Sequence, residues 1–125
     1  MPIKSIERLL FDSFNTGLST YAPVFYDQAD DKIKPPYIVW SLVDNILDGI
    51  YLASSGQARI RVDIYTDNKF DRSDIRNSCG EWLRRFRKTI EQVDFFVDTT
   101  TEISFRRLDD PFYRGTVDAI IKWRF

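Results

Sequence analysis

The sequence predicts an α+β fold in which a mostly antiparallel β-sheet carries two α-helices packed on one face. Two stretches repeat apolar residues at the three- and four-residue spacing of a helix, and six others have the composition or alternation of strands. Their order along the chain, α-β-β-β-α-β-β-β, favours helices segregated to one side of a sheet. With 125 residues and 43% hydrophobic content, the chain has the size and core of one domain, residues 1–125.

The first element is an amphipathic helix near the N-terminus. Pro2 suits the first turn of a helix, and Gly17 can adopt the left-handed conformation that closes one. Between them, apolar residues recur at helical steps: Ile3, Ile6, Leu9, Leu10 and Phe14. The polar, proline-containing stretch that follows indicates a loop with one short strand over residues 24–26.

Two further strands are predicted before the second helix. Residues 36–49 are rich in β-branched and aromatic side chains on both faces, as in a strand that is buried on both sides or pairs with a second chain. Residues 58–66 alternate cleanly, with Ala58, Ile60, Val62 and Ile64 on one face and Arg59, Arg61, Asp63 and Tyr65 on the other. The small, polar segment 49–57 indicates a hairpin tip, and we expect it and the loop 27–34 to be the mobile parts of a free subunit.

The second helix gives the strongest periodic signal and is predicted over residues 70–90. Asp71 or Ser73 can cap its first free amides. We expect Trp82 to pack against the sheet. One stripe contains the apolar residues Ile75, Cys79, Trp82, Leu83, Phe86 and Ile90.

Three strand-like runs complete the domain, and Thr and Asp-Pro turn residues separate them. They cover residues 93–100, 101–110 and 115–125. In the last run the predicted core face contains Val117, Ala119, Ile121, Trp123 and Phe125, and the opposite face contains Thr116, Asp118, Ile120, Lys122 and Arg124.

Composition argues against several functional classes. Eighteen basic and nineteen acidic residues leave a net charge of −1, which provides no general attraction to nucleic acid or to an anionic membrane. No apolar run approaches the ~20 residues that span a bilayer. The single cysteine and the absence of a signal-like leader lead us to expect a protein made and folded in a cytoplasm.

No residue group in the sequence has the pattern of a catalytic or cofactor site. Cys79 lies on an apolar stripe in a chain without histidine, so we expect a buried small side chain rather than a nucleophile. The basic run 84–88 offers phosphate contacts, but we expect it on the solvent face of a helix. Two aspartate groups lack the spacing of a calcium loop and suit turns instead: Asp27, Asp30 and Asp31, and Asp109 with Asp110.

The main functional candidate is the sheet face opposite the core. It mixes both charges with aromatic and aliphatic side chains, which is compatible with a solvent-facing sheet or with a polar protein interface. The candidate interface residues are Arg59, Arg61, Asp63, Tyr65, Arg106, Lys122 and Arg124.

Taken together, the segments resemble the tail-completion or tail-terminator proteins of long-tailed bacteriophages and prophages. The similarity spans nearly the whole chain, from an N-terminal helix and a "PPYIVW" strand to the closing "TEISFRRLDDPFYRGTVDAIIKWRF". Three short patterns support it: Pro-Pro-Tyr-Ile-Val at 35–39, Arg-Val-Asp-Ile-Tyr at 61–65 running into a helix, and an acidic-aromatic turn at 109–113.

This resemblance implies a small α+β subunit of a sixfold ring that caps the phage tail tube. Such a ring ends tube polymerisation and presents the surface that joins the head, with no enzyme activity and no cofactor. The implied partners are copies of itself, the tail tube protein and head-tail connector proteins. DNA would pass through the lumen without specific binding, and the balanced charge suits that role. The implied location is the head-proximal end of the virion tail, after assembly in a bacterial cytoplasm.

Two alternatives remain open from the sequence. One is a different head-tail joining protein of the same virion, such as a connector or stopper. The other is a small ligand-binding domain or enzyme that uses Asp63 and Tyr65 near Arg106. The latter predicts a concave pocket with convergent polar groups and a monomer.

Overall fold

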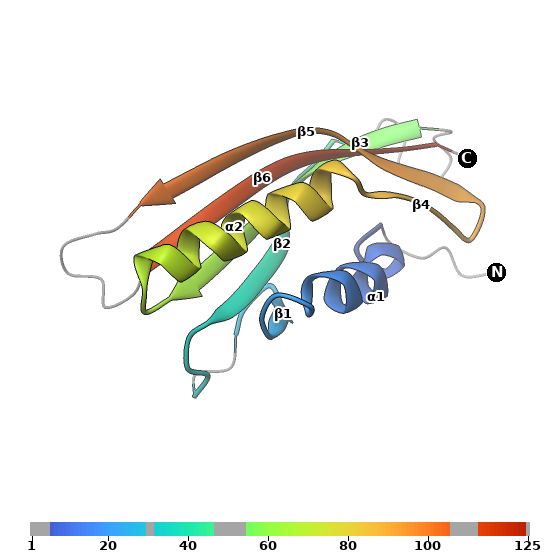
Figure 1. The fold of residues 1–125 in the computed structure, drawn as a ribbon. Coiled ribbons are helices and arrows are strands. Elements are labelled where there is room, and N and C mark those ends of the chain that lie inside the picture. The colour runs from blue at the N-terminus through green and yellow to red at the C-terminus, as the bar shows by residue number, and fades with distance from the viewer. Residues whose placement is uncertain (1–5, 30–31, 47–54, 106–112, 125) are drawn as a thin grey trace.

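The computed structural model describes residues 6–29, 32–46, 55–105 and 113–124, and it confirms the predicted α+β class (Figure 1). Two helices and a six-stranded sheet follow the predicted order of element types. The elements are α1 (Ile6–Leu18), β1 (Val24–Tyr26), β2 (Tyr37–Ile46), β3 (Ser55–Thr66), α2 (Lys69–Arg84), β4 (Arg87–Ile90), β5 (Val93–Phe105) and β6 (Tyr113–Arg124). The loops predicted to be mobile, 27–34 and 49–57, lie partly outside the described residues.

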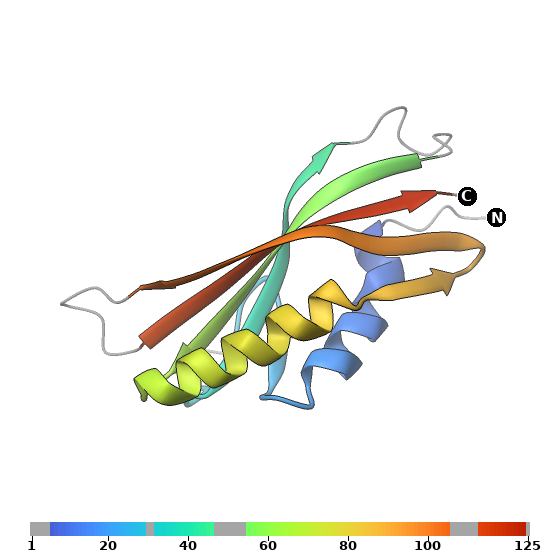
Figure 2. The ribbon, with the colours of Figure 1, turned by 45° about the horizontal axis from the view of Figure 1, so that its top comes forward.

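The sheet is mostly antiparallel, and its strand order is β1-β2-β3-β6-β5-β4. Among the described strands, the short β1 alone runs parallel to its neighbour, β2. The C-terminal strand β6 lies between β3 and β5, so the last element of the chain joins its two halves. Figure 2 shows both helices on one side of this twisted sheet, which confirms the predicted arrangement, and no helix of the described residues lies on the other face.

The two central strands provide the core with the predicted alternation. Ile60, Val62 and Ile64 of β3 are fully buried, and on β6 so are Val117 and Ile121. The register pairs Val62 with Val117 and Ala58 with Ile121, so the two apolar faces coincide. Trp123 is also buried, as predicted, whereas Phe125 lies outside the described residues.

α1 packs on the sheet through Leu10, Phe14 and Leu18, which are fully buried. The Phe14 ring lies 4.9 Å from that of Trp40 on β2 and 5.1 Å from that of Trp82 on α2. The apolar residues of α1, which recur at helical steps along the sequence, therefore form the predicted helix and its predicted buried face.

Trp82 packs against the hydrophobic core, and its ring–ring contacts lie on α1 and just beyond the end of α2. The Trp82 ring contacts Phe14 of α1 and Phe86, and it is only partly buried. The fully buried side chains of α2 are instead Cys79 and Leu83. Cys79 and Leu83 lie one helical turn apart on the sheet-facing side, and Trp82 is turned toward α1.

The predicted limits of the second helix are also wrong at both ends. Asn68, rather than Asp71 or Ser73, is the N-cap, and its side-chain oxygen accepts hydrogen bonds from the amides of Phe70 and Asp71. The helix ends at Arg84, and residues 87–90 form the edge strand β4.

A hairpin turn missed by the sequence analysis explains the early end of α2. Glu91 and Gln92 both have positive φ angles, 49° and 71°, and join β4 to β5 in an antiparallel hairpin. Turns of this kind usually contain Asn or Gly, which are absent here. Phe86 and Ile90 also continue the helical spacing of α2, so the apolar pattern alone favoured a longer helix.

The two runs predicted over 93–110 form one long strand as far as Phe105. The Thr-rich stretch 99–101 continues β5 instead of turning, because β-branched side chains fit a strand. A register shift between Val97 and Thr99 keeps the strand paired with β6. Across the described ranges, none of the helices has the length and apolar character needed to cross a membrane.

Candidate functional site

The sheet face away from the helices, here called the open face, contains the predicted interface residues. Arg59, Arg61, Asp63 and Tyr65 alternate with the buried residues of β3 and therefore point to this side. Lys122 and Arg124 of β6 share the face, because the register aligns them with Gln57 and Ser55. The seventh predicted residue, Arg106, lies outside the described residues.

The centre of the open face is held by polar pairs between β3 and β6. Arg61 Nε donates to Asp118 Oδ1 at 3.0 Å, and Nη2 reaches Oδ2 at 3.4 Å. Hydrogen bonding to Asp118 raises the pKa of Arg61, so the guanidinium stays charged. One step along the register, Thr116 Oγ1 donates to Asp63 Oδ1 at 2.7 Å. These groups therefore already have partners within the subunit.

The cations farther along β6 pair with carboxylates of β5. Lys122 Nζ lies 3.3 Å from Asp98 Oδ2, and Arg124 Nε lies 4.0 Å from Asp94 Oδ2. These pairs are about half exposed, so they contribute little to stability. Arg59 is exposed on the same face. The open face therefore presents positive and negative side chains in alternation rather than side chains of one charge.

At the other end of the strands, the open face ends in a row of aromatic rings. The rings of Tyr37 and Tyr65 stack at 4.8 Å with an interplanar angle of 19°. Phe25 of β1 meets Tyr37 edge-on at 6.3 Å, and the Arg114 guanidinium lies 6.0 Å from the centre of the Tyr65 ring. We call these four residues the aromatic row.

Sequence reasoning found only Tyr65 of the aromatic row. Its other members become visible once the register is known, because Tyr37 and Arg114 are the direct cross-strand neighbours of Tyr65. A single sequence does not give the order of strands in a sheet. It therefore could not predict that β1, β2, β3 and β6 bring these side chains together. The composition of β1 and β2 did mark these two strands as rich in aromatic residues.

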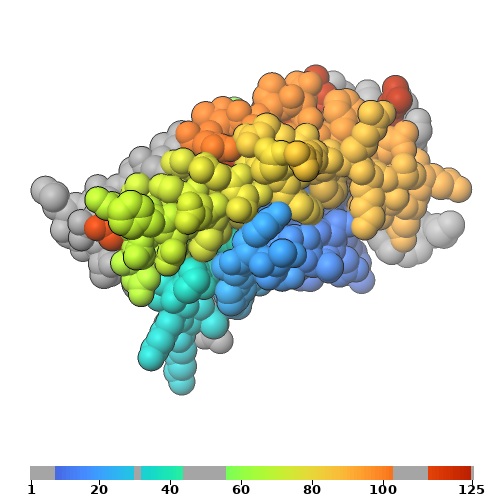
Figure 3. Space-filling model, in the orientation of Figure 1, coloured from blue at the N-terminus to red at the C-terminus, as the bar shows by residue number. Residues whose placement is uncertain are grey.

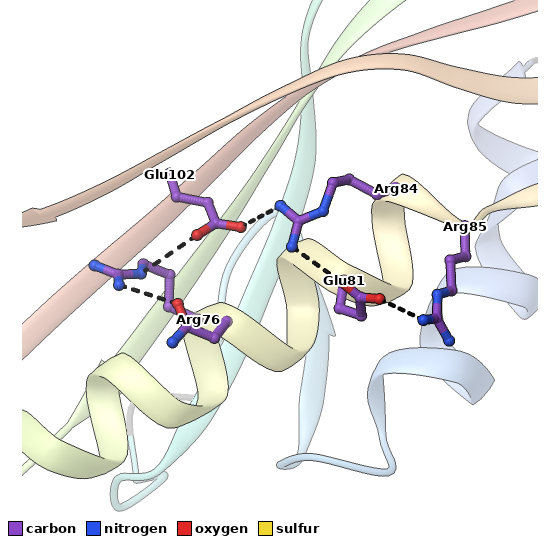
Figure 4. A network of polar contacts seen from close by, with 6 residues as sticks. Arg76, Glu81, Arg84, Arg85 and Glu102 are labelled. Carbon is purple, nitrogen blue, oxygen red and sulfur yellow. Dashed lines mark hydrogen bonds and ion pairs between the residues drawn. The ribbon is translucent and has the colours of Figure 1, made fainter.

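A second charged network lies on the helix side and joins α2 to β5 (Figure 4). Glu102 of β5 accepts from Arg84 Nη1 at 2.6 Å and lies 4.0 Å from Arg76 Nε. Gly80 allows this approach, since a Cβ there would lie 2.8 Å from Cδ of Glu102. The Arg84 side chain extends the network to Glu81, and hydrogen bonding to Arg84 lowers the pKa of Glu81. This network attaches the helix to the sheet.

The basic run 84–88 is divided between elements, contrary to the prediction that it lines one helix face. Arg84 ends α2, Arg85 is its C-cap, and Arg87 with Lys88 lies on β4. Cys79 matches its prediction. It is fully buried, and burial raises the pKa of its thiol from 9.0 to about 12.

Neither of two hollows found in the described parts of the protein contains the residues of the enzyme alternative. One, of about 490 Å³, lies between α1 and the end of α2, and another, of about 310 Å³, lies beside β4 and β5. Asp63 and Tyr65 line neither hollow. Among the described residues, no group of three or more Cys, Asp or Glu side chains is placed to hold a metal ion.

Comparison with known proteins adds information on the fold alone. No family model matches the chain, and no curated protein matches it. A solved structure is similar over 98% of this chain and 98% of its own, with a TM-score of 0.70 and 12% sequence identity. At that identity, the likeness establishes that the whole chain adopts a fold already seen in another protein.

Proposed function

We propose that the protein is a structural virion subunit that forms a ring on the tail tube of a long-tailed phage. The ring, expected to be a hexamer, ends tube polymerisation and provides the head-joining surface. The basis is the whole-chain resemblance in the order of segments, together with the open face. The proposed partners are copies of itself, the tube protein and head-tail connector proteins, with DNA passing through the lumen without specific binding. No catalytic group or cofactor takes part in this role.

The open face is the observation that carries the proposal. A charge that loses water on docking is costly unless it is paired and hydrogen-bonded. Arg61 and Asp118 pair with each other, and Asp63 accepts a hydrogen bond from Thr116 and lies near the Arg61 charge. A second protein can therefore cover this group at a lower cost than it could cover isolated charges. The aromatic row adds Tyr, Phe and Arg side chains, types that are enriched in interfaces.

Ring closure needs two different patches that meet head to tail. The helix-covered side and the open face of this subunit differ in composition, so they satisfy that requirement for unlike surfaces.

The proposal is tested by deleting the gene from a phage that encodes it and examining the lysate by negative-stain electron microscopy. We expect tails that exceed the normal length or remain unattached to full heads. Purified protein added to the extract should restore joined particles. Normal-length, head-joined tails in the deletion lysate would exclude the terminator role. Normal-length tails that fail only to join heads would favour the connector or stopper alternative.

A further inference from the structure

The edge strand β4 is a second surface, and it shares Asp94 and Arg124 with the end of the open face. β4 is four residues long, its first three residues are exposed, and among the described strands it pairs with β5 alone. Its other edge forms one margin of the sheet. The backbone groups along such an edge can pair with an extended segment of another chain.

On the helix side of β4 lies the hollow of about 490 Å³. Trp82 and Phe86 give it an apolar lining, and Arg85 and Lys88 supply positive charge. Asp12 of α1 is the one carboxylate among its lining residues. Figure 3 shows the blue surface of α1 lying directly beneath the yellow end of α2 and β4, where this hollow opens.

On the opposite side of β4 lies the hollow of about 310 Å³. Arg87 and Arg124 give it positive charge, and Phe96 contributes an aromatic ring. Its carboxylate, Asp94, accepts a hydrogen bond from Thr89 Oγ1 at 2.5 Å and lies 4.0 Å from Arg124 Nε. Both sides of the edge strand therefore combine an excess of cations with an aromatic wall.

These two hollows match the geometry of an added strand. Successive side chains of an extended segment point to opposite faces, so a segment paired with β4 sends alternate side chains into the two hollows. Arg87 and Lys88 line both hollows, and Arg85 and Arg124 each add a cation to one of them. Arg85 pairs with Glu81 at 2.7 Å and Arg124 lies 4.0 Å from Asp94, so Arg87 and Lys88 are the cations that remain for an acidic partner. We propose that the β4 edge binds an extended, acidic segment of a different protein by strand addition. An aromatic or branched side chain of that segment covers Trp82 and Phe86.

Charge complementarity favours a different protein over a second copy of this chain. The other edge of the sheet, β1, has the sequence Val-Phe-Tyr and carries no carboxylate to meet the cations beside β4. A nucleic acid would satisfy the cations but has no peptide backbone to pair with the strand edge. The inference does not depend on the proposed ring, and each can fail without the other.

The test uses a capped ten-residue peptide rich in glutamate with one phenylalanine, titrated into ¹⁵N-labelled full-length protein and followed by NMR. We expect shifts at the amides of residues 87–90 and at the Trp82 indole. Lys88→Glu and Arg87→Glu should each weaken binding about tenfold or more. Lys69→Glu makes the same charge change at the exposed start of α2 and should leave binding unchanged. Circular dichroism checks that each variant is folded. If Lys88→Glu unfolds the protein, the binding measured for Arg87→Glu provides the test.

A second peptide distinguishes strand addition from attraction between charges. Methylating alternate backbone nitrogens of the same peptide removes its strand hydrogen bonds and keeps its charge, so we expect binding to be lost. Equal binding of the methylated peptide would overturn the proposal. So would tighter binding of a single-stranded oligonucleotide at the same amides. Self-association through β4, detected by light scattering and abolished by Arg87→Glu, would assign the edge to a second copy and also overturn it.

Discussion

Gly17 and Trp82 set how closely the two helices approach. A Cβ at position 17 would come within 2.5 Å of Cε2 of the Trp82 ring, and that ring is held between Phe14 and Phe86. The indole therefore packs against a residue that has no side chain. Gly17 lies inside α1, which ends at Leu18, and its φ is outside the left-handed region, so it serves this contact and not the helix closure for which the sequence suggested it.

We predict that Gly17→Ala destabilises the domain by about 1–3 kcal/mol, the usual cost of overpacking. In an open helix position the same change would instead stabilise by about 0.5–1 kcal/mol. Urea denaturation measures the difference, with Thr16→Ala as the exposed neighbouring control. Adding Trp82→Leu should reduce the cost of Gly17→Ala, because the smaller side chain leaves room for the methyl group. A Gly17→Ala protein as stable as wild type would show that the ring moves aside freely.

The buried Cys79 thiol makes a second prediction at this scale. Its pKa is raised from 9.0 to about 12, so the folded protein should react with a thiol reagent at pH 8 only when it unfolds. The thiol favours the folded state fully below pH 9.0, and this contribution is lost as pH rises toward 12. Cys79→Ala should remove that part of the pH dependence. Rapid labelling without denaturant would contradict the buried placement.

Among the elements, α2 depends on a cap that lies outside the predicted helix. We predict that Asn68→Ala destabilises the domain by about 1 kcal/mol, because the amides of Phe70 and Asp71 lose their acceptor. Asn68→Asp should be nearly neutral. Ser73→Ala is the matched control, since Ser73 was the alternative cap suggested by the sequence. Thermal denaturation ranks the three variants, and a larger loss for Ser73→Ala would contradict the assignment.

Sequence reasoning succeeded for elements whose burial follows a single period. The alternation of β3 and β6 placed Ile60, Val62 and Ile121 in the core and Arg61 and Lys122 on the open face. It failed where one apolar pattern fits two structures, as at Phe86 and Ile90, and where a turn lacked its usual residues, as at Glu91 and Gln92. The aromatic row and the hollows beside β4 depend on strand order, which no local pattern contains.

At the scale of the whole molecule, the sheet is covered on one face and open on the other. The helices bury the apolar face, and on the open face charges such as Arg61 and Lys122 pair with carboxylates of the neighbouring strands. The β4 margin adds a cationic edge beside that face. We therefore expect assembly to depend on the surface chemistry of these regions more than on the stability of the subunit.

The most direct test of this account is assembly in a deletion extract supplemented with purified wild-type protein, Arg59→Glu or Lys69→Glu. Both substitutions are exposed and should change the free energy of unfolding by less than about 0.5 kcal/mol. We predict that wild type and Lys69→Glu restore infectious, head-joined particles equally, and that Arg59→Glu restores about tenfold fewer because it disturbs the open face. Equal restoration by all three proteins, or none by wild type, would contradict the claim that the open face builds the tail-capping ring.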